Sequence, residues 1–187
     1  MFNSNDLWIG WFQGREDNFA VDGLVDVVKG IVSNLNIENE NILFFSTSSG
    51  GIPAINLAKN FLGCDVFAGN IQTNALLFYS GSVDKMLKAS YPGKSKEQVS
   101  IDYKHRISID HIDSDFNLYY AQNLADNYHF KTFFQPFSES RRHIRGYYYT
   151  YDHEKSGHGP MQKNVELAVI KNILQGNSLD SIYRNIT

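Results

Sequence analysis

The amino-acid sequence predicts a small α/β domain in which a mostly parallel β-sheet carries helices on both faces. In the first 70 residues, short apolar runs typical of buried strands alternate with stretches of helical periodicity. Such alternation favours a parallel sheet with right-handed crossovers. Apolar residues make up 42% of the 187-residue chain and charged residues 20%, an ordinary globular mix that supplies one core. We therefore expect a single domain over residues 1–187.

The first third of the chain follows this alternation closely. Residues 21–35 place apolar side chains at helical spacing on one face, with Asp22, Asp26 and Lys29 on the other. Pro53 stands in the first turn of the next expected helix, where its missing N–H costs nothing. In chain order, the expected elements are a strand over 7–12, a helix over 21–35, a strand over 42–45, a helix over 53–62 and a strand over 64–68.

The alternation of strand and helix patterns stops between residues 73 and 112. Apolar residues over 76–87 indicate a helix, Pro92 and Gly93 break it, and Ser95 with Gln98 forms a candidate capping box. We interpret residues 73–112 as a cap or lid inserted over the edge of the sheet. The remaining expected elements are a strand over 118–121, a strand over 144–151, a loop over 156–160 and a closing helix over 165–173.

Composition excludes several classes of protein. The net charge is −3 and no basic stripe is present, which argues against binding to nucleic acid. No apolar run approaches the roughly 20 residues of a membrane span, and residues 1–12 lack the pattern of a signal peptide. The single cysteine, Cys64, fits a reducing compartment. We expect a cytoplasmic protein, and no spacing of residues predicts a metal or other cofactor.

The turn after the second expected strand has the form small-x-Ser-x-Gly, with Ser46, Ser48 and Gly50 at the key positions. A serine on a sharp strand-to-helix turn needs small residues two before and two after it, because helix and strand approach closely there. The start of the following helix can stabilise a developing negative charge. Ser48 is therefore a candidate nucleophile. An ordinary or phosphate-binding Ser/Gly turn is the alternative, while the absence of a Gly-Lys-Ser/Thr sequence excludes a Walker loop.

A nucleophilic serine needs a base, and the base needs a group that orients it. Asp126 follows the strand expected to end near residue 123, and His158 lies in the loop after the last strand. Serine, aspartate and histidine thus occur in the chain order expected when parallel strands deliver all three from their carboxyl ends. A solvated loop histidine is the alternative for His158.

Four segments share a pattern with a known family. They read Ile42 to Gly51, Asn70-Ile71-Gln72-Thr73, Gln122-Asn123-x-x-Asp126-x-x-His129 and Gly157-His158-Gly159-Pro160. Over residues 7–174 the chain resembles α/β-hydrolase-like proteins found in bacterial surface-polysaccharide (capsule) gene clusters. The resemblance implies Ser48 as nucleophile, Asp126 as acid and His158 as base.

The chain departs from that pattern at three places. Ile71 replaces a proline and Ser46 replaces a glycine. We also expect the N-terminal strands of the sheet to be shortened or missing. The Ser49 N–H is expected to supply one donor of the oxyanion hole. The second donor must come from the Gln13–Gly14 loop, or it is absent. Weaker candidates for substrate binding are Asn70, Gln72, His129 and Arg141, with a structural role for His129 and a solvated loop at Arg141 as alternatives.

The sequence thus favours a serine esterase or acyltransferase of the Ser-His-Asp type that acts on an acylated saccharide or a small ester. Two alternatives remain open at this point. One is a weak or inactive hydrolase-fold protein with a binding or assembly role, and the other is a protein associated with a glycosyltransferase. An exposed sheet edge would also favour association of two copies of the chain or binding of a partner chain.

Overall fold

The computed structural model describes residues 9–113, 115–140, 145–152, 157–159, 161–180 and 184–185. Its centre is a sheet in the order β1-β2-β3-β4-β5, in which the first four strands run parallel and β5 pairs antiparallel with β4. The strands are β1 (Leu43–Thr47), β2 (Asp65–Gly69), β3 (Asn117–Asn123), β4 (Arg145–Tyr151) and β5 (Arg184–Asn185). The expected parallel sheet is confirmed, and every expected strand from residue 42 onward is found within a few residues of its predicted bounds.

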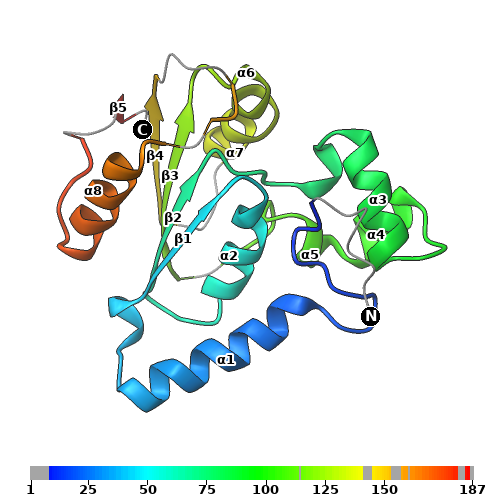
Figure 1. Cartoon of the computed structure of the whole chain (residues 1–187), viewed down its shortest axis with the longest axis horizontal. Coiled ribbons are helices and arrows are strands. Elements are labelled where there is room, and N and C mark those ends of the chain that lie inside the picture. Colours follow the sequence, from blue (N-terminus) through cyan, green and yellow to red (C-terminus); the bar gives the residue numbers. More distant parts are fainter. Residues whose placement is uncertain are drawn as a thin grey trace.

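Helices cover both faces of this sheet (Figure 1). The helix α8 lies on one face, whereas α1 and α2 lie on the other. The helices are α1 (Ala20–Leu35), α2 (Gly51–Ala58), α3 (Ser80–Ser90), α4 (Lys96–Asp102), α5 (Lys104–Ile107), α6 (Asn127–His129), α7 (Gln135–Glu139) and α8 (Lys163–Leu174). A π-helical turn at Phe130–Phe134 joins α6 to α7.

Each face of the sheet has its own apolar core. The larger core joins α1, α2 and the helices of residues 73–112 to the sheet, and Ile52, Ile55 and Tyr120 at its centre have no exposed surface. The smaller core lies under α8, where Phe67 of β2 and Val169 of α8 are fully buried. Burial of this apolar surface is the main favourable term in folding. The strands that carry the site therefore lie between two packed layers.

The helix α1 matches its predicted bounds within one residue. Val21 and Val25 are buried on its inner face, and Asn36 ends it in the left-handed conformation with φ +50°. Asparagine is one of the few residues that adopt this conformation readily, which explains the sharp stop. The capping box at Ser95 and Gln98 is also present, at the start of α4.

Two regions differ from expectation. The strand predicted over 7–12 is wrong where the structure describes it, because Ile9 to Phe12 form a loop and Trp11 and Phe12 both have left-handed backbone; residues 7 and 8 lie outside the described part. The helical stretch from Asn127 to Glu139 was not predicted at all. The N-terminal loop bends because Trp11 is drawn into the interior, where its side chain is 2% exposed.

Residues 73–112 form a compact insertion between β2 and β3. Its two ends meet, because Asn74 pairs with Ser108 in an isolated bridge and the Ile109 N–H donates to the Thr73 carbonyl at 2.9 Å. In Figure 1 its helices α3, α4 and α5 gather beside the N-terminal loop. A buried hydrogen bond of 2.7 Å from the Tyr91 hydroxyl to Gln13 Oε1 ties the two together. In the described part of the chain, no helix has the length and apolar character needed to span a membrane.

Candidate active site

Ser48 lies at the end of β1, on the turn that leads into α2. Its φ is +52°, a left-handed conformation that costs an L-residue free energy. A 3₁₀ turn over Ser48–Gly50 follows, and α2 begins at Gly51. A Cβ atom on Gly51 would lie 2.4 Å from the Cβ of Ile71, so only glycine lets the helix approach the end of β2 this closely. The turn therefore has the tight strand-to-helix geometry that presents a serine hydroxyl at the sheet edge.

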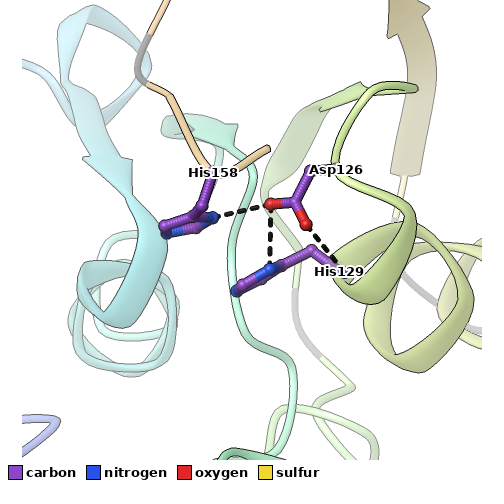
Figure 2. Close-up of side chains that lie close together, drawn as sticks. All are labelled: Asp126, His129 and His158. Atoms are coloured by element: carbon purple, nitrogen blue, oxygen red, sulfur yellow. Dashed lines mark hydrogen bonds and ion pairs between the residues drawn. The ribbon is translucent and has the colours of Figure 1, made fainter. Parts of the chain in front are cut away.

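His158 lies between Ser48 and Asp126. Its Nε2 is 2.7 Å from Ser48 Oγ, and its Nδ1 is 2.8 Å from Asp126 Oδ2. The His158 side chain is 37% exposed, whereas the Asp126 side chain is 5% exposed. Figure 2 shows the imidazole pointing its Nδ1 at the carboxylate. A hydroxyl, an imidazole and a carboxylate thus follow one another at hydrogen-bonding distance, with the imidazole exposed and the carboxylate buried.

Asp126 is placed by the short helix that it starts. As the N-cap of α6, its Oδ1 accepts the His129 N–H at 3.1 Å, which is a standard use of aspartate at a helix start. Burial alone would raise the pKa of this carboxyl, but the His129 N–H and the two histidine side chains outweigh burial and hold its pKa below the ordinary value. The carboxylate form is therefore stabilised at neutral pH.

Two asparagines fix the loop that carries His158. Asn123, the last residue of β3, donates from Nδ2 to the Gly157 carbonyl at 3.3 Å. Asn70, just beyond β2, donates to the Gly159 carbonyl at 3.3 Å and to the Tyr151 hydroxyl at 2.7 Å, and accepts the Asn123 N–H at 2.7 Å. The chain ends of three neighbouring strands thus share one network that holds the histidine loop.

A second histidine shares the same carboxylate. Nδ1 of His129 lies 2.9 Å from Asp126 Oδ2, and its ring stacks on that of His158 with centroids 4.0 Å apart (Figure 2). His129 is 2% exposed, and burial together with the nearby His158 lowers its pKa to about 4. It is therefore neutral at neutral pH.

The far side of His129 meets Gln72. The Gln72 Nε2 lies 3.4 Å from His129 Nε2 and 3.5 Å from Ser48 Oγ. Trp11 donates from its indole nitrogen to Gln72 Oε1. Sequence reasoning missed Trp11, because nothing in a short apolar run shows which residue will reach the site. His129 had a usable signal, since an aspartate followed three residues later by a histidine puts both on one helical turn.

The oxyanion prediction needs a correction at Gln13. The Gln13 N–H already donates to the Gly10 carbonyl at 2.9 Å, and the buried side chain bonds to Trp11, Tyr91 and Arg106. Gly14 turns with φ +68° tightly against Asn18 and Ala20. Ser49, in contrast, directly follows Ser48 at the start of the helical turn, where N–H groups are free of intrahelical partners.

Three of the residues predicted to bind substrate are buried. Asn70, Gln72 and His129 are 4%, 0% and 2% exposed, and their polar atoms face one another and the triad rather than solvent. They support the site from behind, and their role in substrate binding stays a prediction. Arg141 lies outside the described residues.

Three of these groups could also bind a metal ion. Asp126, His129 and His158 offer ligand atoms within 4.8 Å of one another. However, both Nδ1 atoms already face the same carboxylate oxygen, and the outer nitrogen of His158 faces the serine hydroxyl. A metal would have to displace these contacts, whereas proton transfer uses them as they stand.

No protein-family model matches the chain, and no curated protein matches its sequence. Among solved structures, the capsule O-acetyltransferase of Neisseria meningitidis serogroup A is similar, with a TM-score of 0.56 and 17% identity over 89% of this chain and 68% of that chain. The same enzyme in complex with caged gadolinium has a TM-score of 0.51 and 17% identity, over 82% of this chain and 64% of that chain. A puromycin hydrolase mutant has a TM-score of 0.58 and 14% identity, over 89% of this chain but only 27% of that chain.

These similarities, together with the parallel sheet, confirm the predicted fold class. The chain has a small α/β-hydrolase-like fold. A fold of this kind hosts many functions, so the chemistry has to be argued from the site.

Proposed function

We propose that this chain is a cytoplasmic serine esterase or acyltransferase that acts on an acylated saccharide or a similar small ester. One observation carries the proposal: Ser48 Oγ, His158 and Asp126 follow one another at 2.7 and 2.8 Å. This is the geometry of a nucleophile, a base and an orienting acid.

In the proposed reaction, His158 Nε2 takes the proton of Ser48 while Oγ attacks the ester carbonyl carbon. The Asp126 carboxylate keeps the His158 proton on Nδ1 and stabilises the imidazolium that forms. The tetrahedral intermediate carries its negative charge beside the Ser49 N–H. His158 then protonates the departing alcohol, and water or an acceptor hydroxyl releases the acyl group from Ser48 by the same steps in reverse.

The saccharide part of the proposal has separate support. The similar structure from Neisseria meningitidis is a capsule O-acetyltransferase. The family that the sequence resembles is likewise found in surface-polysaccharide gene clusters. The triad lies near the surface, because His158 is 37% exposed and Ser48 is half-buried. An acyl group on a large polar molecule could therefore reach Ser48 without opening of the protein.

A fluorophosphonate probe tests the chemistry, because it labels only an activated serine. We expect labelling of wild-type protein and none of Ser48→Ala, and hydrolysis of p-nitrophenyl acetate should disappear in the same variant. Ser49→Ala, which keeps the backbone N–H, is the matched control and should still be labelled. Folded wild-type protein that takes no label would refute the proposal.

The second candidate is a binding or assembly protein on a hydrolase scaffold. It is favoured by the Gln13 N–H, which is bonded to Gly10 and does not complete an oxyanion hole. Loss of one such donor slows catalysis by roughly 100- to 1000-fold. Function in cells that survives Ser48→Ala unchanged would support this candidate over the enzyme.

A further inference from the structure

A buried line of polar groups lies behind the triad. It starts at Trp11 and passes through Gln72 and His129 to Asp126. We infer that His129 is a positioning residue: it carries its proton on Nδ1 and holds the Asp126 carboxylate in the orientation in which that carboxylate meets His158. The inference rests on the proposed function for its catalytic meaning, but the proton position of His129 can be tested without it.

The orientation of the Gln72 amide is set by Trp11. An indole N–H can only donate a hydrogen bond, so the atom of Gln72 that faces it must be the oxygen. The NH₂ group of Gln72 then points to the other side, toward His129 and Ser48. Gln72 is fully buried, so no water competes for these positions.

The orientation of Gln72 in turn decides the protonation of His129. An NH₂ group only donates, so His129 Nε2, at 3.4 Å, must be an acceptor. A proton on that nitrogen would place two donors face to face in a buried site. The proton of His129 therefore lies on Nδ1, which is 2.9 Å from Asp126 Oδ2.

Asp126 consequently has three N–H groups around it. The His129 backbone N–H donates to Oδ1, and Nδ1 of His158 lies 2.8 Å from Oδ2. Nδ1 of His129 lies 2.9 Å from the same Oδ2, close enough for electrostatic attraction although its direction is not that of a hydrogen bond. Rotation of the carboxylate would weaken at least one of these contacts. The His158 imidazole is oriented by this carboxylate, so groups that hold Asp126 in place also hold His158 in place.

The neutral state of His129 also matters for the proposed reaction. His158 gains a positive charge when it accepts the serine proton, and the His129 ring is stacked 4.0 Å away. A second charge at that distance would oppose the transfer. Burial favours the neutral form of His129 and agrees with the proton arrangement imposed by Gln72.

The same arrangement argues against His129 as an alternative base. Its Nε2, the nitrogen that would have to accept the serine proton, faces the Gln72 amide. That amide lies within 3.5 Å of Ser48 Oγ and 3.4 Å of His129 Nε2. No direct contact between His129 and Ser48 is found in the described residues.

Nitrogen-15 NMR of histidine-labelled resting protein tests the proton position directly. We expect His129 to give the signals of a neutral ring protonated on Nδ1, unchanged between pH 8 and 6. A ring protonated on Nε2, or one that gains charge in this range, would overturn the inference. This measurement needs no turnover, so it stands even if the proposed hydrolysis fails.

A matched pair of variants tests the effect on catalysis. His129→Asn keeps a side-chain N–H near the place of Nδ1, and His129→Phe keeps the ring and its stacking but has no donor. We expect His129→Phe to lower kcat for p-nitrophenyl acetate by about 100-fold, the usual cost of a misplaced catalytic group, with little change in KM. His129→Asn should recover at least tenfold of that loss.

A purely structural role for His129 predicts a different order of activity for the two variants. If His129 only fills space, His129→Phe should be as active as His129→Asn or more so, and that result would refute the inference. Trp11→Phe provides a second route should His129→Phe fail to fold. It removes the indole donor while an aromatic ring remains. We expect this variant to have a lower kcat and to show mixed His129 proton positions by NMR. An unchanged kcat together with a single Nδ1-protonated form would count against the line of groups.

Discussion

Ser48 has a backbone conformation that serine does not favour. Its φ of +52° costs an L-residue about 1 kcal/mol, whereas glycine adopts this region freely. Both Ser48→Gly and Ser48→Ala remove the hydroxyl, so they differ mainly in this backbone term. We expect Ser48→Gly to be more stable than Ser48→Ala by about 1 kcal/mol in urea unfolding.

The same pair of substitutions at Ser100 is the control, because there we expect the alanine variant to be more stable than the glycine variant. Ser100 is exposed in the middle of α4, where alanine favours the helix over glycine by about 1 kcal/mol. Ser100→Ala should therefore be the more stable variant of that pair. Equal stability of the two Ser48 variants would show that the turn carries no backbone strain.

His129 makes the stability of the protein depend on pH. Its pKa is lowered from 6.5 to about 4 by burial and by the neighbouring His158. The unfolded chain therefore binds a proton between pH 6.5 and 4 that the folded protein does not. The contribution of His129 to the free energy of unfolding is fully present above pH 6.5. It should fall by up to about 3 kcal/mol as the pH drops to 4.

Urea unfolding at pH 7 and pH 4.5 measures this loss, with His129→Asn as the comparison. The pKa values of His105 and His111 are also lowered by burial, but both histidines remain in the variant. The difference between wild type and variant thus isolates His129. Parallel pH profiles for the two proteins would contradict the prediction.

Chain order made the three triad positions predictable. Ser48, Asp126 and His158 each follow a strand of a parallel sheet, so their loops must meet at one edge. Gln72 and Trp11 could not be assigned this way, because their roles depend on which nitrogen faces which oxygen. Such contacts are tertiary, and neither residue has a local pattern that reveals them.

Among the elements, the turn between β1 and α2 depends on glycine at position 51. A Cβ there would lie 2.4 Å from the Ile71 Cβ, a contact that forces backbone to move. We expect Gly51→Ala to destabilise the protein by about 1–3 kcal/mol in urea unfolding and to slow fluorophosphonate labelling of Ser48.

Gly23 in α1 gives the opposite expectation and the control. It is exposed in a helix, and a Cβ there meets no atom within 4 Å. Gly23→Ala should raise stability by about 0.5–1 kcal/mol because alanine favours the helix. A stabilising Gly51→Ala would mean that α2 and β2 are less tightly packed than the structure has them.

Elements with a clear period were predictable, and two others were not. The run over 7–12 looks like a strand because it is apolar, but the burial of Trp11 bends it into a loop. From Asn127 to Glu139, aromatic residues that suit strands and Pro136 obscure the helical spacing of Phe130, Phe133, Phe134 and Phe137. Packing of Phe134 and Phe137 against Tyr120 and Tyr148 stabilises the helical stretch.

At the scale of the whole molecule, the sheet separates two apolar cores of unequal size. β1 is the outer strand of the described sheet, and the pairing of two copies along it stays a prediction of the sequence. We propose that residues 73–112, which pack beside the N-terminal loop, act as the cap expected from the sequence.

The meeting of Thr73 with Ile109 has a consequence for how such a protein can diversify. A segment that leaves and re-enters the sheet at one point can lengthen, shorten or be exchanged without shifting the register of β2 against β3. We expect evolution to alter substrate preference mainly there, while the strands that bear the serine, the aspartate and the histidine loop stay fixed.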